Sequence, residues 1–117
     1  MNLITEFEIR PTYLFVKISG MWTKEDAFEL IEKIKTKAIE IDLKRILLDL
    51  VNFSVPISEM TRFYTGEKIA SSLISYKIAG YSQHEKINKF AEVVTVNRGG
   101  NLKMFDSETE ALNWLLS

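Results

Sequence analysis

The run ILLDLV at residues 46–51 constrains the fold of this chain more than any other segment. A strand with one solvated face alternates apolar and polar residues, whereas this run is apolar at every position except Asp49. A short, nearly unbroken apolar run is typical of a central parallel strand that is covered on both faces. The sequence therefore predicts a sheet in which this strand lies inside.

Shorter patterns predict the other strands. Residues 3–10 and 12–19 alternate in polarity, which indicates two strands joined as a hairpin around Pro11. Short apolar runs predict two more strands at residues 76–81 and 102–105. The segment at residues 52–57 contains Pro56 and no helical periodicity, so we expect a loop there.

Four helices are predicted from apolar residues at helical spacing that follow a residue able to cap the first turn. Their expected ranges are Thr23 to about residue 40, residues 58–72, Ser82 to about Gly99, and Ser107 to the end of the sequence. The first should carry a charged face of Glu29, Lys33, Lys37 and Glu40. In the second, Met60 and Phe63 should face inward, while Ser58, Arg62 and Thr65 should lie on a more exposed face.

The predicted order is β-β-α-β-α-β-α-β-α. Strands that alternate with helices form largely parallel sheets, so the fold class is α/β, with a mixed, mostly parallel sheet whose hairpin is antiparallel. The length of 117 residues fits a single domain, residues 1–117.

Composition excludes several classes of function. The formal charge of −1 provides no net field for nucleic acid or an anionic membrane. The absence of cysteine and the presence of one histidine, His84, argue against metal sites and the usual catalytic triads. No dinucleotide, P-loop or hydrolase-elbow motif occurs, so no cofactor is expected. Without a basic leader or a membrane span, a cytoplasmic location is expected.

The segment at residues 49–58 holds the candidate site. Asp49 ends a buried strand, where ligands gather in α/β sheets, and either accepts hydrogen bonds from the amides that follow or acts as a base. Phe53, Val55 and Ile57 are unusually apolar for a loop and either cover the core or line a pocket. Ser58 is expected to cap the next helix, whose amino terminus could also hold an anion or a phosphorylated serine.

The strand at residues 46–51 leads through a loop to a capped helix, and the C-terminal part carries NRGG at residues 97–100, MF at 104–105, AL at 111–112 and WL at 114–115. Together with the element order, these motifs resemble the SpoIIAA-like group within the STAS fold. The resemblance implies a compact domain with helices mainly on one side of a mixed sheet. Relatives include anti-sigma-factor antagonists and the cytoplasmic domains of anion transporters, which bind partners and do not catalyse reactions.

The resemblance also implies two kinds of ligand or modification. In anti-sigma antagonists the phosphorylated residue begins the helix after the central strand, which corresponds by position to Ser58 or Ser54, although their Asp-Ser-Ser/Thr-Gly motif is absent here. SpoIIAA-like proteins are also grouped with lipid-binding Sec14-type domains, which implies an apolar ligand.

The leading hypothesis is a non-catalytic binding module that engages a partner protein or a small apolar or anionic ligand. Its expected binding residues are Asp49, Phe53, Ser54, Ser58 and Arg62. Two alternatives stay open: a phosphorylation-controlled regulator acting through Ser58 or Ser54, and an enzyme that uses Asp49. A homodimer is also expected if Trp22, Phe28 and Ile39 form an exposed apolar patch.

Overall fold

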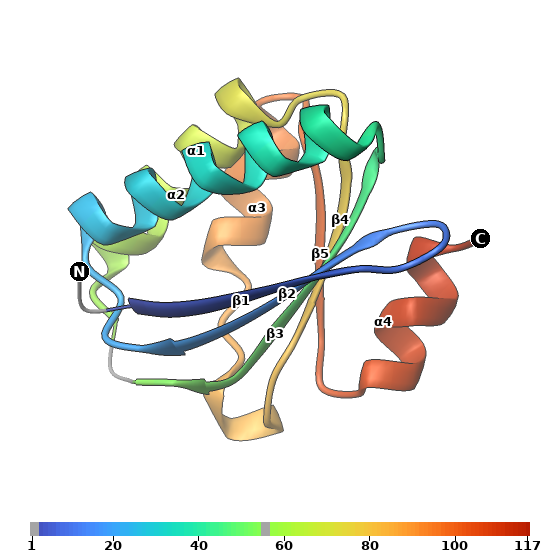
Figure 1. The fold of residues 1–117 in the computed structure, drawn as a ribbon. Helices are drawn as coiled ribbons and strands as arrows, with labels where there is room; N and C mark the ends of the chain where they lie inside the picture. Colours follow the sequence, from blue (N-terminus) through green and yellow to red (C-terminus); the bar gives the residue numbers. More distant parts are fainter. Residues whose placement is uncertain (1–2, 55–56) are drawn as a thin grey trace.

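Five strands form one sheet, in the same order in which they occur along the chain. The computed structural model describes residues 3–54 and 57–117. The strands are β1 (Leu3–Ile9), β2 (Leu14–Gly20), β3 (Arg45–Phe53), β4 (Lys77–Tyr81) and β5 (Asn101–Phe105). β1 pairs antiparallel with β2 and every other neighbouring pair is parallel (Figure 1), which confirms the predicted mixed sheet.

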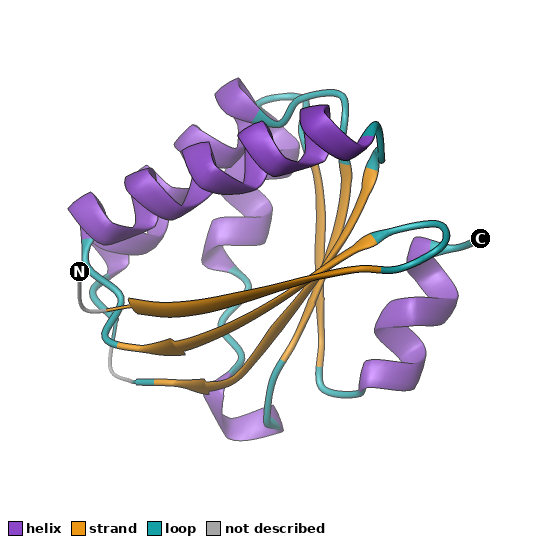
Figure 2. Ribbon diagram, viewed as in Figure 1, coloured by secondary structure: helices purple, strands orange, loops and turns teal. Residues whose placement is uncertain are grey.

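The handedness of the connections decides where the helices lie. The three crossover helices are α1 (Lys24–Ile41), α2 (Glu59–Ser72) and α3 (Phe90–Asn97), and each leads to the next strand in the same direction across the sheet. Because such crossovers are right-handed, all three helices must cover the same face. Among the helices of the described residues, only α4 (Glu108–Leu115), which follows the last strand, covers the opposite face (Figure 2), as the prediction of helices mainly on one side requires.

The central strand β3 supplies both apolar layers. Ile46, Leu48 and Leu50 belong to the larger core beneath α1, α2 and α3. Leu47 belongs to the smaller core beneath α4, and Val51 packs against it. This double burial explains the nearly unbroken apolar run and confirms the prediction made from it.

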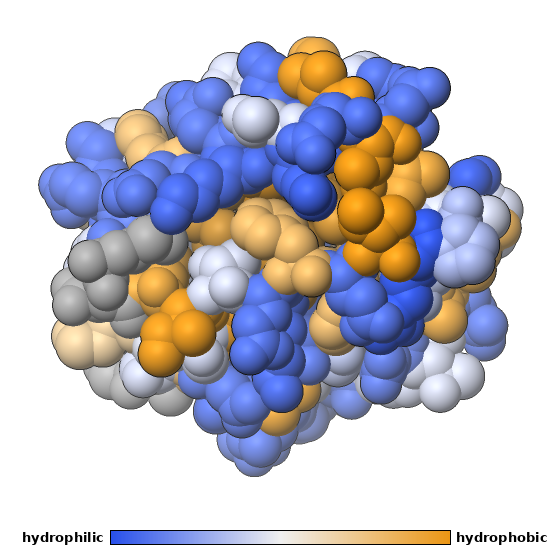
Figure 3. All heavy atoms as spheres, viewed as in Figure 1, coloured by the Kyte–Doolittle hydropathy of each residue, from blue (hydrophilic) through white to orange (hydrophobic). Residues whose placement is uncertain are grey.

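The charged face of α1 is also as predicted. Glu29 and Lys33, one turn apart, form an ion pair with 3.4 Å between the carboxylate oxygen and the ammonium nitrogen. The surface over α1 is largely hydrophilic in Figure 3. No helix in the described part of the chain is long and apolar enough to cross a membrane.

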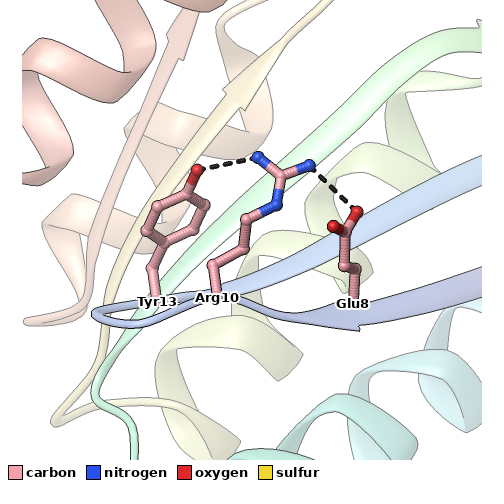
Figure 4. A network of polar contacts seen from close by, with 3 residues as sticks. All are labelled: Glu8, Arg10 and Tyr13. Atoms are coloured by element: carbon pink, nitrogen blue, oxygen red, sulfur yellow. Dashed lines mark hydrogen bonds and ion pairs between the residues drawn. The ribbon is translucent and has the colours of Figure 1, made fainter.

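Arg10 closes the hairpin between β1 and β2. Its guanidinium donates hydrogen bonds to the Glu8 carboxylate at 3.0 Å and to the Tyr13 hydroxyl at 2.9 Å (Figure 4). It also lies 4.5 Å from the centre of the Phe15 ring. The hydrogen bond from Arg10 holds the pKa of Glu8 below its ordinary value. The turn falls around Pro11, as predicted. The contacts of Arg10 with Glu8 and Phe15 connect the turn to both strands of the hairpin.

Basic side chains of the sheet hold the last turn of α4. Arg45 of β3 donates to the Leu115 carbonyl at 3.1 Å, and Lys77 of β4 donates to the Trp114 carbonyl at 2.7 Å. Cations stabilise the negative end of a helix dipole. These bonds therefore fix α4 on its face of the sheet.

Three predicted helix starts are confirmed. The side chains of Thr23, Ser58 and Ser107 each accept a hydrogen bond from the backbone amide three residues later.

The fourth predicted start, at Ser82, is wrong. The chain makes a short 3₁₀ turn, η1 (His84–Lys86), and α3 begins only at Phe90. Ser82 is buried and donates its hydroxyl to the Leu50 carbonyl at 3.0 Å, so it satisfies the backbone of β3 and caps no helix.

Two smaller expectations are also corrected. β3 continues through Asn52 and Phe53, which were expected in a loop; Val55 and Pro56 lie outside the described residues. Met60, expected to face inward, lies in the first turn of α2 and is 57% exposed.

Gly66 sets how closely α2 and α3 approach. A Cβ atom built there would lie 2.8 Å from the Ala91 carbonyl oxygen and 2.9 Å from Val94 Cβ. Gly66→Ala in a helix interior is ordinarily stabilising by about 0.5–1 kcal/mol. Here we expect it to lower the free energy of unfolding by about 1–3 kcal/mol, because the contact with α3 backbone cannot relax without a shift of the helix.

Urea unfolding measures this difference, with Ser71→Ala on the exposed side of the same helix as the control. The control should change stability little or raise it slightly, since alanine is the better helix former. A Gly66→Ala variant as stable as the parent would contradict the close packing of α2 on α3.

Candidate functional site

A bulge near the end of β3 sets the geometry of the site. Lys17 of β2 pairs with Asp49, but Ser19 pairs with Asn52, so β3 contains one extra residue at this point. The Asp49 carboxylate accepts a hydrogen bond from the Val51 amide at 3.0 Å and supports the irregular backbone. The extra residue resets the alternation of side chains. Phe53 therefore lies in the larger core beneath α1, α2 and α3.

Asp49 itself points to the other face of the sheet, toward Tyr81 and α4. Burial raises the pKa of the Tyr81 hydroxyl, and the charges of Asp49 and Glu108 raise it further. Tyr81 thus keeps its proton at neutral pH. The structure does not bring Asp49 together with Phe53 and Arg62, because the sheet separates them.

A cavity of about 70 Å³ lies on the helix-covered face, between the end of β3 and helices α2 and α3. A water molecule takes up about 30 Å³ of liquid, so the cavity has room for about two. Its wall is mostly apolar and includes Leu48, Leu50, Phe53, Ile57, Ile69 and Met104. Its polar members are Arg62, Thr65, Ser82, Lys86 and Asn88.

Most of these polar groups are already hydrogen-bonded. Thr65 accepts the Trp22 indole N–H at 3.1 Å and donates to the Thr61 carbonyl at 2.7 Å. Thr65 is 5% exposed, which corrects its expected place on the exposed face of α2.

Trp22 is half-buried because its indole packs against the core and hydrogen-bonds Thr65, so it does not extend an exposed patch with Phe28 and Ile39. Lys86, from η1, donates to the Val51 carbonyl at 2.8 Å and closes another side of the cavity.

Arg62 is the exception among the polar members. Its Nε atom is buried and has no hydrogen-bond partner among the described residues. Burial lowers the pKa of the Arg62 guanidinium, and the negative charge of Glu59 opposes that shift only in part. A buried donor without a partner costs free energy.

The two candidate serines lie outside the cavity lining. Ser58 is exposed; it accepts the Thr61 amide at 3.1 Å and donates its hydroxyl to the Thr61 side chain at 2.9 Å. Ser54 is also exposed, and its backbone amide donates to the Gly20 carbonyl at 2.7 Å. Of the five expected binding residues, the cavity brings together Phe53 and Arg62.

Sequence reasoning missed several members of the cavity. Ser82, Lys86 and Met104 follow β3 by tens of residues and join it only through the register of the sheet. In that register Leu48 lies opposite Gly80, which in turn lies opposite Met104. No local pattern links these positions.

No group of three or more side chains able to hold a metal ion occurs in residues 3–54 and 57–117. His84 is highly exposed, as expected, and its Nδ1 lies 3.0 Å from the Asp106 carboxylate.

Comparison with solved structures identifies the fold. An anti-sigma factor antagonist from Mycobacterium paratuberculosis superposes with a TM-score of 0.68 at 10% identity, covering 98% of this chain and 95% of its own. The anti-sigma factor antagonist SpoIIAA in its unphosphorylated form gives a TM-score of 0.62 at 12% identity, covering 97% and 96%. The chain therefore has a STAS, SpoIIAA-like fold, as the resemblance implied.

A third solved structure is an uncharacterized protein of the DUF3478 family from Shewanella loihica, described as having a SpoIIAA-like fold. It matches with a TM-score of 0.59 at 20% identity, covering 97% of this chain and 94% of its own. No protein-family model matches the sequence, and no curated protein matches it significantly.

Proposed function

We propose that this chain is a non-catalytic, regulatory binding module that holds a small ligand in the cavity behind Phe53. The observation that carries the proposal is a mostly apolar cavity lined by Arg62, whose Nε is buried and has no hydrogen-bond partner among the described residues. Ligand sites typically combine an apolar lining with a few polar groups that fix orientation. Arg62 is the polar group left available for that purpose.

The chemistry around the cavity favours binding over catalysis. General acid–base catalysis requires a group that exchanges a proton near neutral pH within hydrogen-bond reach of the substrate. Arginine keeps its proton throughout that range, and Lys86 is engaged with backbone carbonyls of β3. Asp49, the base of the enzyme alternative, lies on the opposite face of the sheet.

A protein partner is the second part of the proposal. Solved neighbours are named as anti-sigma factor antagonists, which supports a regulatory role through another protein. The first turn of α2 connects ligand binding with partner binding. Arg62 lines the cavity, while Ser58, Glu59 and Met60 at the start of the same helix are exposed. A ligand that binds Arg62 would alter the exposed surface of this turn, which a partner protein would contact.

Native mass spectrometry of protein purified from its own host tests the ligand. We expect a bound small molecule on the parent protein that is absent from Ala91→Leu, because Ala91 lines the cavity and a larger side chain fills it. Val93→Leu is the matched control. It adds bulk to the same helix on its exposed side, where Val93 is 49% exposed, and should retain the ligand.

Equal ligand content in Ala91→Leu and the parent would place the ligand elsewhere and contradict the proposal. Ligand-free parent protein, even after gentle purification, would contradict it as well.

Control by phosphorylation at Ser58 is a second candidate. Ser58 is exposed at the N-terminus of α2, and Arg62 lies one helical turn further on. A phosphate at this position is stabilised by the helix dipole and by a nearby arginine. Ser54 is exposed too but precedes the helix, so the same stabilisation does not apply to it.

Intact-mass analysis across growth conditions tests this candidate. We expect a form heavier by one phosphate in the parent and in Ser54→Ala, but not in Ser58→Asn. Asparagine caps a helix about as well as serine, so this variant removes the hydroxyl and keeps the helix start. A phosphate that persists in Ser58→Asn, or none in any condition, would contradict the assignment.

A further inference from the structure

We propose that the ligand is a short-chain aliphatic carboxylate whose carboxylate binds Arg62 and whose hydrocarbon chain fills the cavity behind Phe53. This inference rests on the proposed binding function and specifies its ligand class. Three properties of the cavity support it: its size, the form of its cation, and the charges around that cation.

The size of the cavity limits the hydrocarbon part. At about 70 Å³ it accepts about two or three carbon groups, if each takes a volume similar to that of one water molecule. Leu50, Ile69 and Met104 provide apolar surface for them. With the carboxyl carbon outside the apolar part, the best acid has about three or four carbons in all.

The form of the cation favours a carboxylate. Arg62 presents a planar fork of N–H donors, which matches the two oxygens of a carboxylate. Its buried Nε lacks an acceptor in the described part of the chain, and a small shift of the side chain toward a carboxylate oxygen would supply one. An anion at this point would also offset the burial that lowers the pKa of the guanidinium.

The surrounding charges favour one negative charge over two. Lys86, the other cation in the described lining, already donates to the Val51 carbonyl, so it is not free to neutralise a second charge. Glu59 lies close enough to act electrostatically on Arg62 and would repel a dianion more strongly than a monoanion. A carboxylate therefore fits better than a phosphate.

Isothermal titration calorimetry with acetate, propionate, butyrate, isovalerate and octanoate tests the chain length. Affinity should rise about fourfold for each methylene that enters the cavity, since burial of one contributes about 0.8 kcal/mol. The rise should stop at about three or four carbons. Equal affinity for acetate and butyrate would contradict the apolar role of the cavity.

Butyramide and inorganic phosphate test the head group. The neutral amide should bind at least tenfold more weakly than butyrate, because a hydrogen bond to a charged group is worth about 1.5–3 kcal/mol. Phosphate should bind more weakly than butyrate as well. Binding of either probe as tightly as butyrate would contradict a carboxylate site.

Arg62→Met tests the residue, with Arg98→Met as the control. Arg98 is an exposed arginine that pairs with Glu67, so its loss should leave butyrate binding unchanged. Arg62→Met should abolish binding without lowering stability in urea, because Nε has no hydrogen-bond partner to lose in residues 3–54 and 57–117. Arg62→Lys keeps the charge but not the fork and should bind at least several-fold more weakly. Unchanged binding in Arg62→Met would overturn the inference.

The two proposals fail in different ways. A native ligand that is lost in Ala91→Leu but is not a carboxylate would overturn this inference and leave the binding module intact. Absence of both a native ligand and any carboxylate binding would overturn both.

Discussion

The bulge in β3 is the constraint on which the site depends. One extra residue after Asp49 shifts the alternation of the strand, so that Leu50 and Phe53 both reach the larger core. The Asp49 carboxylate supports this course by accepting the Val51 amide. Asp49, the acidic residue inside the apolar run, thus stabilises the bulged backbone from one face of the sheet. The bulge in turn places Phe53 in the wall of the cavity on the other face.

The connections between the strands bring the other residues of the cavity wall to the end of β3. Each parallel strand follows its neighbour in one direction, so the right-handed crossovers stack α1, α2 and α3 on one face. The amino terminus of α2 then lies beside the carboxyl end of β3, and Arg62 and Phe53 line the same cavity. Lys86 and Ser82 tie the segment after β4 to carbonyls of β3 and close the remaining side.

Local signals predicted the fold well, and non-local contacts explain the errors. The caps at Thr23, Ser58 and Ser107 depend on an amide three residues away, so sequence spacing reveals them. The hydroxyl of Ser82 instead bonds a strand thirty-two residues earlier, and no spacing rule predicts that. The hydrogen bond between Trp22 and Thr65 joins residues forty-three positions apart. For that reason the sequence did not reveal that both side chains are partly or fully buried. Phe53 and Arg62 were identified because the apolar loop and the helix start adjoin in sequence.

An NMR titration of the arginine side-chain Nε–H signals with butyrate can observe the buried donor itself. The chain has four arginines, at positions 10, 45, 62 and 98, so each signal can be assigned by single substitution. We expect the Arg62 signal to move and to exchange more slowly with solvent as butyrate is added, while the other three stay in place. An Arg62 signal that does not respond, or four signals that shift alike, would contradict a ligand site built on this guanidinium.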